Sequence, residues 1–224
     1  IIEIPADHRG IDLERLEFFM QQGSAKLCLL TANFQNPLGY CLSNQQKQRI
    51  AELAEQYQCF ILEDDIYAEC SYQKERPLPI RHWDRKGYVI LCGSVSKSLS
   101  SAYRVGWFCL GQQLEHLRPQ FLANNIGVNT PLQLGLADFI YSRGYREHLE
   151  QLRPNLMRQV EQYRSCILRA FDGLPIALSQ PEGGYALWIQ LPKGVDTLAL
   201  YYTAKAQGIT VVPGHVFGED ERYR

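Results

Sequence analysis

The sequence lacks an excess of charge of either sign, a long apolar run and a leader-like start. Its 224 residues contain 23 Lys and Arg against 24 Asp and Glu, for a net charge of −1, so the balance gives no sign of a polyanionic partner. No apolar run approaches the ~18–20 residues of a membrane span, and residues 1–5 lack the basic and apolar regions of a signal peptide. We therefore expect no membrane contact, and we expect any DNA binding to lie outside this chain.

Cysteine and histidine are present, but without the spacings of a disulfide framework or a zinc site. The seven cysteines are odd in number and none forms a C-x-x-C pair, which is typical of small core residues in a reducing compartment. The five histidines are scattered, and none lies at ligand spacing from a cysteine. We expect a cytoplasmic protein without a metal site.

The rest of the composition is that of a folded α/β protein. The chain is 46% hydrophobic, with 17 Gly and 11 Pro, which is apolar enough to form a core. At this length we expect one large domain or nearly two small ones. We find no internal repeat and no low-complexity tract.

The first half of the chain alternates between apolar strands and helices. Residues 43–58 carry apolar side chains at helical spacing, and Ser43 and Gln46 form a capping-box pattern at the start. Four short apolar runs have crossover-length connections between most of them, which predicts a mostly parallel sheet. The runs are residues 26–31, 59–63, 88–92 and 105–110.

The second half is predicted to be helical and then mixed. Its helices are expected at residues 112–125, 131–143 and 145–171. Strands are expected at residues 177–179, 186–190 and 210–212, with a helix at 197–207 that Gly208 ends. The change from alternating strands and helices to a mainly helical stretch places a domain boundary between residues 118 and 148.

Polar clusters follow three of the predicted strands at their carboxyl ends. They are Asn-Pro-Leu-Gly at 36–39, Glu-Asp-Asp-Ile-Tyr at 63–67 and Gly-Ser-Val-Ser-Lys-Ser at 93–98. In open α/β sheets, ligands bind outside the carboxyl ends of the strands. The three loops therefore form one candidate site.

Each cluster taken alone also has another interpretation than a part of this candidate site. Asn-Pro-x-Gly is most often only a turn. The acidic residues 63–65 suit a solvated loop or a Mg²⁺ site, and the serine-rich residues 93–101 suit a flexible linker or an anion-binding loop. No Walker loop occurs.

The order of the motifs is more specific than any one of them. A strand-end lysine follows two serines and precedes an arginine by seven positions, downstream of Asn-Pro-x-Gly and Asp-x-x-Tyr. This order resembles the fold-type I pyridoxal-phosphate enzymes, and within them the class I/II aminotransferases. Residues 181–188 and 212–217 are similar to the small-domain signatures of that family. The sequences of residues 33–39 and 62–69 resemble those of the aminotransferase-like domains of MocR-type regulators of the GntR family.

The resemblance implies a role for each matching residue. Lys97 would hold the cofactor aldehyde as a Schiff base and shuttle a proton, and Asp64 would keep the pyridine nitrogen protonated. Asp65 would take that role if the tyrosine spacing were read as two, and we favour Asp64. The remaining implied contacts are Tyr67 and Asn36 on the ring oxygen, and Ser94, Ser96 and Arg104 on the phosphate. Lys97, Asp64 and Tyr67 would be the catalytic residues.

The resemblance also implies an architecture that this chain holds only in part. We expect residues 1–118 to be a partial, mostly parallel large domain of the aspartate aminotransferase-like fold, 119–147 a helical connector, and 148–224 an incomplete small α+β domain. A Gly-rich phosphate turn would precede Ile1, and the arginine for the substrate carboxylate would follow Arg224. We therefore expect no transaminase turnover by this chain.

Three function hypotheses follow. The first is the pyridoxal-phosphate-binding domain of a MocR-type regulator, which senses an amino compound while a domain absent from this chain binds DNA. The second is a free-standing aminotransferase acting on an amino acid and a 2-oxo acid. The third is a Mg²⁺-dependent α/β enzyme using residues 63–65. The family resemblance further implies a homodimer.

Overall fold

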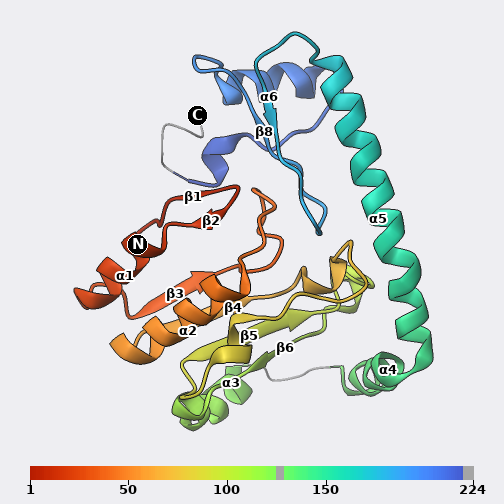
Figure 1. The fold of residues 1–224 in the computed structure, drawn as a ribbon. Helices are drawn as coiled ribbons and strands as arrows, with labels where there is room; N and C mark the ends of the chain where they lie inside the picture. The colour runs from red at the N-terminus through yellow and green to blue at the C-terminus, as the bar shows by residue number, and fades with distance from the viewer. Residues whose placement is uncertain (125–128, 219–224) are drawn as a thin grey trace.

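A four-stranded sheet forms the centre of the N-terminal half (Figure 1). The computed structural model describes residues 1–124 and 129–218. In the sheet, three neighbouring strands are parallel and the fourth is antiparallel, which confirms the mostly parallel sheet. In spatial order the strands are β3 (Leu27–Leu30), β4 (Phe60–Asp64), β5 (Val89–Ser94) and β6 (Gly106–Cys109).

Two helices, α1 (Leu13–Gln21) and α2 (Asn44–Tyr57), cover one face of this sheet. The capping box of α2 is present, because the Ser43 hydroxyl accepts from the Gln46 N–H at 3.2 Å and the Gln46 side chain accepts from the Ser43 N–H at 2.9 Å. The helices bury Leu16, Met20, Ile50 and Leu53 against Ile61 and Val89 of the strands. The other face is more open, since Leu27 and Leu29 are 58% and 68% exposed.

Short elements complete the N-terminal half. A two-stranded antiparallel hairpin, β1 (Ala6–Asp7) and β2 (Gly10–Ile11), precedes α1. Three 3-10 helices lie in the connections between sheet strands, at Ala68–Cys70, Ile80–Trp83 and Ser101–Tyr103. The first lies directly after the polar residues 63–67 and the third directly before Arg104, so these two turns border the loops that carry polar clusters.

The helical region follows the prediction with one change in type. A 3-10 helix at Gln112–Leu117 leads into α3 (Arg118–Asn124), and Asn125, the last residue of that predicted helix, lies outside the described residues. Then come α4 (Thr130–Tyr141) and α5 (Arg143–Ala170), a 28-residue helix that contains Pro154. At ~1.5 Å per residue α5 is about 42 Å long, and it runs from the sheet region to the C-terminal part (Figure 1).

The C-terminal part pairs two short strands beside a helix. They are β7 (Ala177–Leu178) and β8 (Ile189–Gln190), which are antiparallel, and α6 (Thr197–Ala206). The strand predicted at residues 210–212 is wrong: these residues are irregular, and Val211 and Val212 are exposed. Apolar β-formers do not make a strand without a partner, and among residues 1–124 and 129–218 none pairs with them. The domain limits at 118 and 147 stay predictions.

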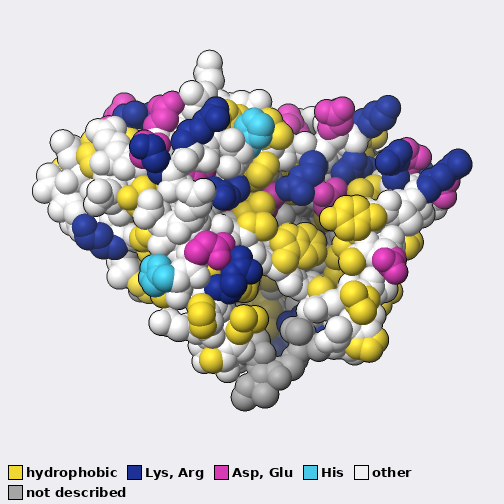
Figure 2. All heavy atoms as spheres, turned by 90° about the horizontal axis from the view of Figure 1, so that it is seen from below, with side chains coloured by type: hydrophobic (Ala, Val, Ile, Leu, Met, Phe, Trp, Pro, Cys, Tyr) yellow, Lys and Arg dark blue, Asp and Glu magenta, His cyan; other side chains and the backbone are white. Residues whose placement is uncertain are grey.

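The surface carries both charge signs, as the near-zero net charge predicts. In the view from below, apolar side chains gather in the middle of the face among basic and acidic ones (Figure 2). Within the described ranges, no helix has both the length and the apolar character needed to cross a membrane.

The capping box offers a direct test of this fold. Replacing Ser43 with Ala removes the acceptor for the Gln46 N–H, so we expect the free energy of unfolding to fall by about 1 kcal/mol in urea titrations. The exposed, mid-helical Ser165→Ala is the control, and we expect it to leave stability unchanged or slightly raised. Equal stability of the wild type and Ser43→Ala would contradict the cap.

Candidate functional site

The carboxyl ends of β4 and β5 bring two of the polar clusters to one edge of the sheet. Asp64 is paired with Cys92, and Ser94 ends β5 two residues further on. Because β6 runs antiparallel, its first residue, Gly106, lies opposite Ser94. Arg104, two residues before β6, therefore returns to the same edge.

Lys97 and Tyr67 lie against each other in the loops beyond this edge. The Lys97 Nζ is 5.2 Å from the centroid of the Tyr67 ring, and both side chains are half-buried. The phenol face attracts a cation at this distance. The structure thus joins the lysine of one cluster to the tyrosine of another, as convergence of the loops requires.

The serine hydroxyls form a local cluster at the end of β5. The Ser94 Oγ lies 2.8 Å from the Ser96 Oγ, accepts from the Ser96 N–H at 3.0 Å, and lies 3.0 Å from the Val105 carbonyl oxygen as a donor. This cluster ties the loop after β5 to the residue that leads into β6. Arg104, which directly precedes Val105, has a left-handed backbone at φ 52° and an exposed side chain.

Asn36 and Arg104 stand apart from the other predicted residues. Asn36 lies in a tight turn in which the Gly39 N–H donates to the Gln35 carbonyl at 2.6 Å, and its peptide bond to Pro37 is cis. Both side chains are exposed. In the described part of the chain, neither forms a hydrogen bond or ion pair with another predicted site residue. Among the described residues, the side-chain contacts between predicted site residues are those of Lys97 with Tyr67 and of Ser94 with Ser96.

The three consecutive carboxylates of β4 and its end do not share one environment. Glu63 is buried and accepts from the Ile80 and Arg81 N–H groups at 2.7 and 3.0 Å. Asp65 is 7% exposed and accepts from the Asn33 side chain at 2.7 Å and from Arg76. Asp64, between them, is half-buried and accepts from the Ile66 N–H at 3.3 Å. Asp64 is thus the carboxylate left available to a ligand.

This arrangement bears on the two alternatives for the acidic run. Alternation along a strand sends residues 63 and 65 to one side and residue 64 to the other, so the three cannot converge on a Mg²⁺ ion while these contacts last. No cluster of three metal-ligating side chains occurs among the residues described. Asp65 is committed to Asn33 and Arg76, which supports Asp64 over Asp65 as the ligand-facing residue.

A buried polar network behind the site was missed by the sequence analysis. Lys47 of α2 is 1% exposed, and its Nζ donates to the Asn33 side-chain oxygen at 2.6 Å. Asn33 in turn donates to Asp65. Burial lowers the pKa of Lys47 and raises the pKa of Asp65, which Arg76 opposes. The network joins the loop after β3 to the loop after β4, and its sequence signal is a lysine on the apolar face of a helix.

A second missed feature is the docking of residues 182–185 on the loop after β4. The Tyr72 N–H donates to the Glu182 carbonyl at 2.9 Å, and the Gly184 N–H donates to the Cys70 carbonyl at 3.0 Å. Ser71 and Gly183 form an antiparallel bridge. The Tyr185 hydroxyl donates to the Lys97 carbonyl. A C-terminal segment therefore borders the site.

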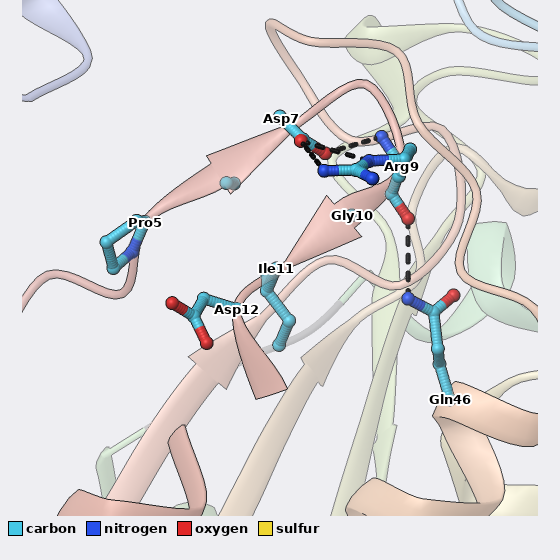
Figure 3. Close-up of a pocket in the computed structure, with 8 residues that line it drawn as sticks. Pro5, Asp7, Arg9, Gly10, Ile11, Asp12 and Gln46 are labelled. Atoms are coloured by element: carbon cyan, nitrogen blue, oxygen red, sulfur yellow. Dashed lines mark hydrogen bonds and ion pairs between the residues drawn. The ribbon is translucent and has the colours of Figure 1, made fainter. Parts of the chain in front are cut away.

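A pocket of about 460 Å³ lies away from these residues, at the N-terminal hairpin (Figure 3). Asp7 and Arg9 form an ion pair at its rim, and the Gln46 side chain of α2 donates to the Arg9 carbonyl at 3.4 Å. It contains none of the predicted site residues. A much smaller hollow, about 30 Å³, is lined in part by Asp65, Ser94 and Trp107. The side chains that converge at the ends of β4 and β5, and not the hairpin pocket, therefore make up the candidate site.

Comparison with known proteins supplies independent information. The family model described as aminotransferase class I and II matches residues 1–224. The HTH-type transcriptional regulator YdcR of Escherichia coli K12 is 34% identical over 214 residues, which are 96% of this chain and 46% of that protein. Aromatic-amino-acid aminotransferase 1 of Thermococcus litoralis is 30% identical over 227 residues, 96% of this chain and 53% of that protein. The chain thus spans about half the length of the curated relatives it matches.

Solved structures agree with this match. The kynurenine aminotransferase of Pyrococcus horikoshii, solved in complex with PMP, has a TM-score of 0.87 at 26% identity, covering 96% of this chain and 55% of that one. The multiple substrate aminotransferase of Thermococcus profundus has a TM-score of 0.84 at 30% identity, with the same coverage.

Glu63 gives a prediction for the pH dependence of stability. Burial raises its pKa to about 7, although two backbone N–H groups oppose the shift. The folded-state pKa is above the ordinary carboxyl value, so stability from this group is fully present at low pH and is lost as the pH rises through about 7. We expect the unfolding free energy of the wild type to decline from pH 4.5 to above pH 7 by up to about 3 kcal/mol relative to Glu63→Gln.

Urea titrations at a series of pH values measure this difference. The exposed Glu150→Gln is the control and should follow the wild type at each pH. Parallel curves for the wild type and Glu63→Gln would show that the Glu63 carboxyl keeps its ordinary titration.

Proposed function

Because this chain belongs to the class I and II aminotransferase family, we propose that it binds pyridoxal 5'-phosphate and attaches it covalently to Lys97. The observation that carries the proposal is the placement of the Lys97 amine, half-buried against Tyr67 in the loops beyond the strand edge where β4 ends in Asp64. An amine in such a place serves as a nucleophile and then as a base. The fold and the family match support the same reading.

The donor set at this edge suits the cofactor. When bound, pyridoxal phosphate supplies an aldehyde that an amine can join and a ring that withdraws electrons from the substrate when its nitrogen is protonated. Asp64 would hold the proton on that nitrogen, as a carboxylate pairs with a cation. Tyr67 and Asn36 would donate to the ring oxygen. The phosphate would be held by Ser94, Ser96 and Arg104, two hydroxyls and a permanently charged planar donor.

Lys97 and Tyr67 would then take part in the reaction of the substrate, Lys97 by proton transfer and Tyr67 by holding Lys97. Lys97 would move a proton to and from the substrate carbon, because a neutral amine can accept a proton and its ammonium form can return it. Tyr67 would keep the Lys97 amine in place through its ring face. Residues 182–185 would limit the access of water from the C-terminal side.

For the whole protein we propose a MocR/GntR-type transcriptional regulator that senses a small amino compound. Two relatives of more than 30% identity are HTH-type transcriptional regulators, YdcR and YjiR of Escherichia coli K12. In this proposal DNA is contacted only by a separate domain, the protein acts in the cytoplasm as a homodimer, and no membrane is involved. The near-neutral charge of this chain supports a separate DNA-binding part.

The second candidate is a free-standing aminotransferase that transfers an amino group between an amino acid and a 2-oxo acid. The 30% identity to an aromatic-amino-acid aminotransferase favours it. The complete reading frame around this sequence separates the two candidates. A winged-helix segment upstream of Ile1 supports the regulator, and a continuous aminotransferase sequence there supports the enzyme.

The cofactor proposal predicts a spectroscopic change that depends on Lys97. Adding pyridoxal phosphate to the protein should produce a near-visible absorption band, and Lys97→Ala should abolish it because the attaching amine is gone. Borohydride reduction followed by peptide mapping should place the cofactor on Lys97. The control is Lys86→Ala, which removes an exposed amine paired with Glu55 and should keep the band. Mg²⁺ binding without any band would refute the proposal.

The neighbouring aspartates make a matched pair of variants. Asp64→Asn should leave thermal stability nearly unchanged and weaken pyridoxal phosphate binding about tenfold or more, since a charge-assisted hydrogen bond is lost. Asp65→Asn should keep pyridoxal phosphate binding close to that of the wild type, because Asp65 is turned toward Asn33 and Arg76. Cofactor titration and urea unfolding measure the two effects. A stable Asp65→Asn that has lost binding would assign the ring nitrogen to Asp65 instead.

A further inference from the structure

The backbone at Lys97 and Ser98 is held by side chains from distant parts of the chain. The Lys97 carbonyl accepts from the Tyr185 hydroxyl and lies 3.5 Å from the Cys70 thiol. The Ser98 carbonyl lies 2.6 Å from the His148 Nε2, and the Ser98 hydroxyl lies 3.4 Å from the Tyr145 hydroxyl. Both carbonyls of the lysine loop therefore have their positions fixed from outside that loop.

Tyr185 reaches Lys97 from a segment that is itself firmly placed. Residues 182–184 pair with residues 70–72 through two backbone hydrogen bonds and a bridge. The Tyr72 hydroxyl adds a hydrogen bond to the Gly184 carbonyl at 3.0 Å. Gly183 packs so closely on Phe34 that a Cβ there would lie 2.6 Å from the ring. These contacts fix the position of the backbone from which the Tyr185 side chain extends.

The Tyr185 ring also contacts Tyr67, the residue whose ring faces the Lys97 amine. It meets the Tyr67 ring edge-on, with centroids 6.0 Å apart and an interplanar angle of 65°. The Tyr67 ring in turn lies 5.2 Å from the Lys97 Nζ. Tyr185 thus contacts the Lys97 backbone directly. It also contacts Tyr67, whose ring lies against the Lys97 amine.

From these contacts we propose that Tyr185 is a positioning residue for Lys97, and that through it the C-terminal part of the chain sets how readily Lys97 takes up pyridoxal phosphate. This inference rests on the proposed attachment at Lys97. In that step the amine forms a C=N bond with the aldehyde carbon, and the aldehyde oxygen leaves as water. The rate depends on how closely the amine is held to the line of attack.

The hydroxyl of Tyr185 is suited to this task. Partial burial raises its pKa above the ordinary value, so the hydroxyl keeps its proton and can donate at neutral pH. Without it, the Lys97 carbonyl keeps only the Cys70 thiol among the donors described, and a thiol is a weak donor. The loop around Lys97 then gains freedom, and the amine spends less time aligned.

The test compares two tyrosines of the same docked segment. Tyr185→Phe removes the hydroxyl that meets Lys97, whereas Tyr72→Phe removes a hydroxyl that holds Gly184 and does not contact Lys97. Both keep their rings, so circular dichroism should match the wild type. We expect Tyr185→Phe to slow formation of the near-visible band about three- to tenfold and to shift the pH midpoint of that band. Tyr72→Phe should remain within about twofold of the wild type.

The outcomes separate this inference from the function on which it rests. Wild-type rates and pH profiles in Tyr185→Phe overturn the positioning role while the attachment at Lys97 stands. Equal slowing in both variants also overturns it, because the docking of the segment, and not the Tyr185 hydroxyl, would then be responsible. A wild-type protein that forms no band on Lys97 refutes the proposed function itself.

Discussion

The candidate site depends on the two-residue alternation of strand β4. Alternation places Glu63 and Asp65 on the side of the helices, where the backbone of residues 80–81 satisfies one and Asn33 and Arg76 satisfy the other. The same alternation turns Asp64 to the opposite side. A shift of one residue in the pairing with β5 would exchange these environments and bury the wrong carboxylate. The three consecutive acidic residues therefore have three roles. Glu63 holds the backbone of residues 80–81, Asp64 faces the candidate site, and Asp65 holds Asn33 and Arg76.

Much of the sheet was predictable because its signals are local. Short apolar runs gave strands β3 to β6 to within about two residues, and Ser43 with Gln46 marked the start of α2 through contacts only three residues apart. The strand expected at 210–212 failed for a non-local reason: Thr-Val-Val has the right composition, but a strand also requires a neighbour with free backbone groups.

The edge of the sheet at which the candidate site lies was predictable, and the side chains that support it were not. The order of loops after parallel strands brought Asp64, Ser94 and Lys97 to one edge. Lys47 could not be placed, because a lysine on a helix is ordinarily solvated and only the Asn33 side chain makes its burial favourable. The contact of Tyr185 with Lys97 joins residues 88 positions apart, so no periodicity within either segment reports it.

Helix α5 links the lysine loop to the C-terminal strands, and Pro154 divides that link in two. His148 and Tyr145 contact Ser98 before the proline, and Arg164 donates to the Ser179 carbonyl at 3.3 Å after it. A proline inside a helix removes one backbone hydrogen bond, so bending concentrates at that point. The ion pair of Arg153 with Glu69 at 2.9 Å, one residue before the proline, ties this point of α5 to the loop after β4.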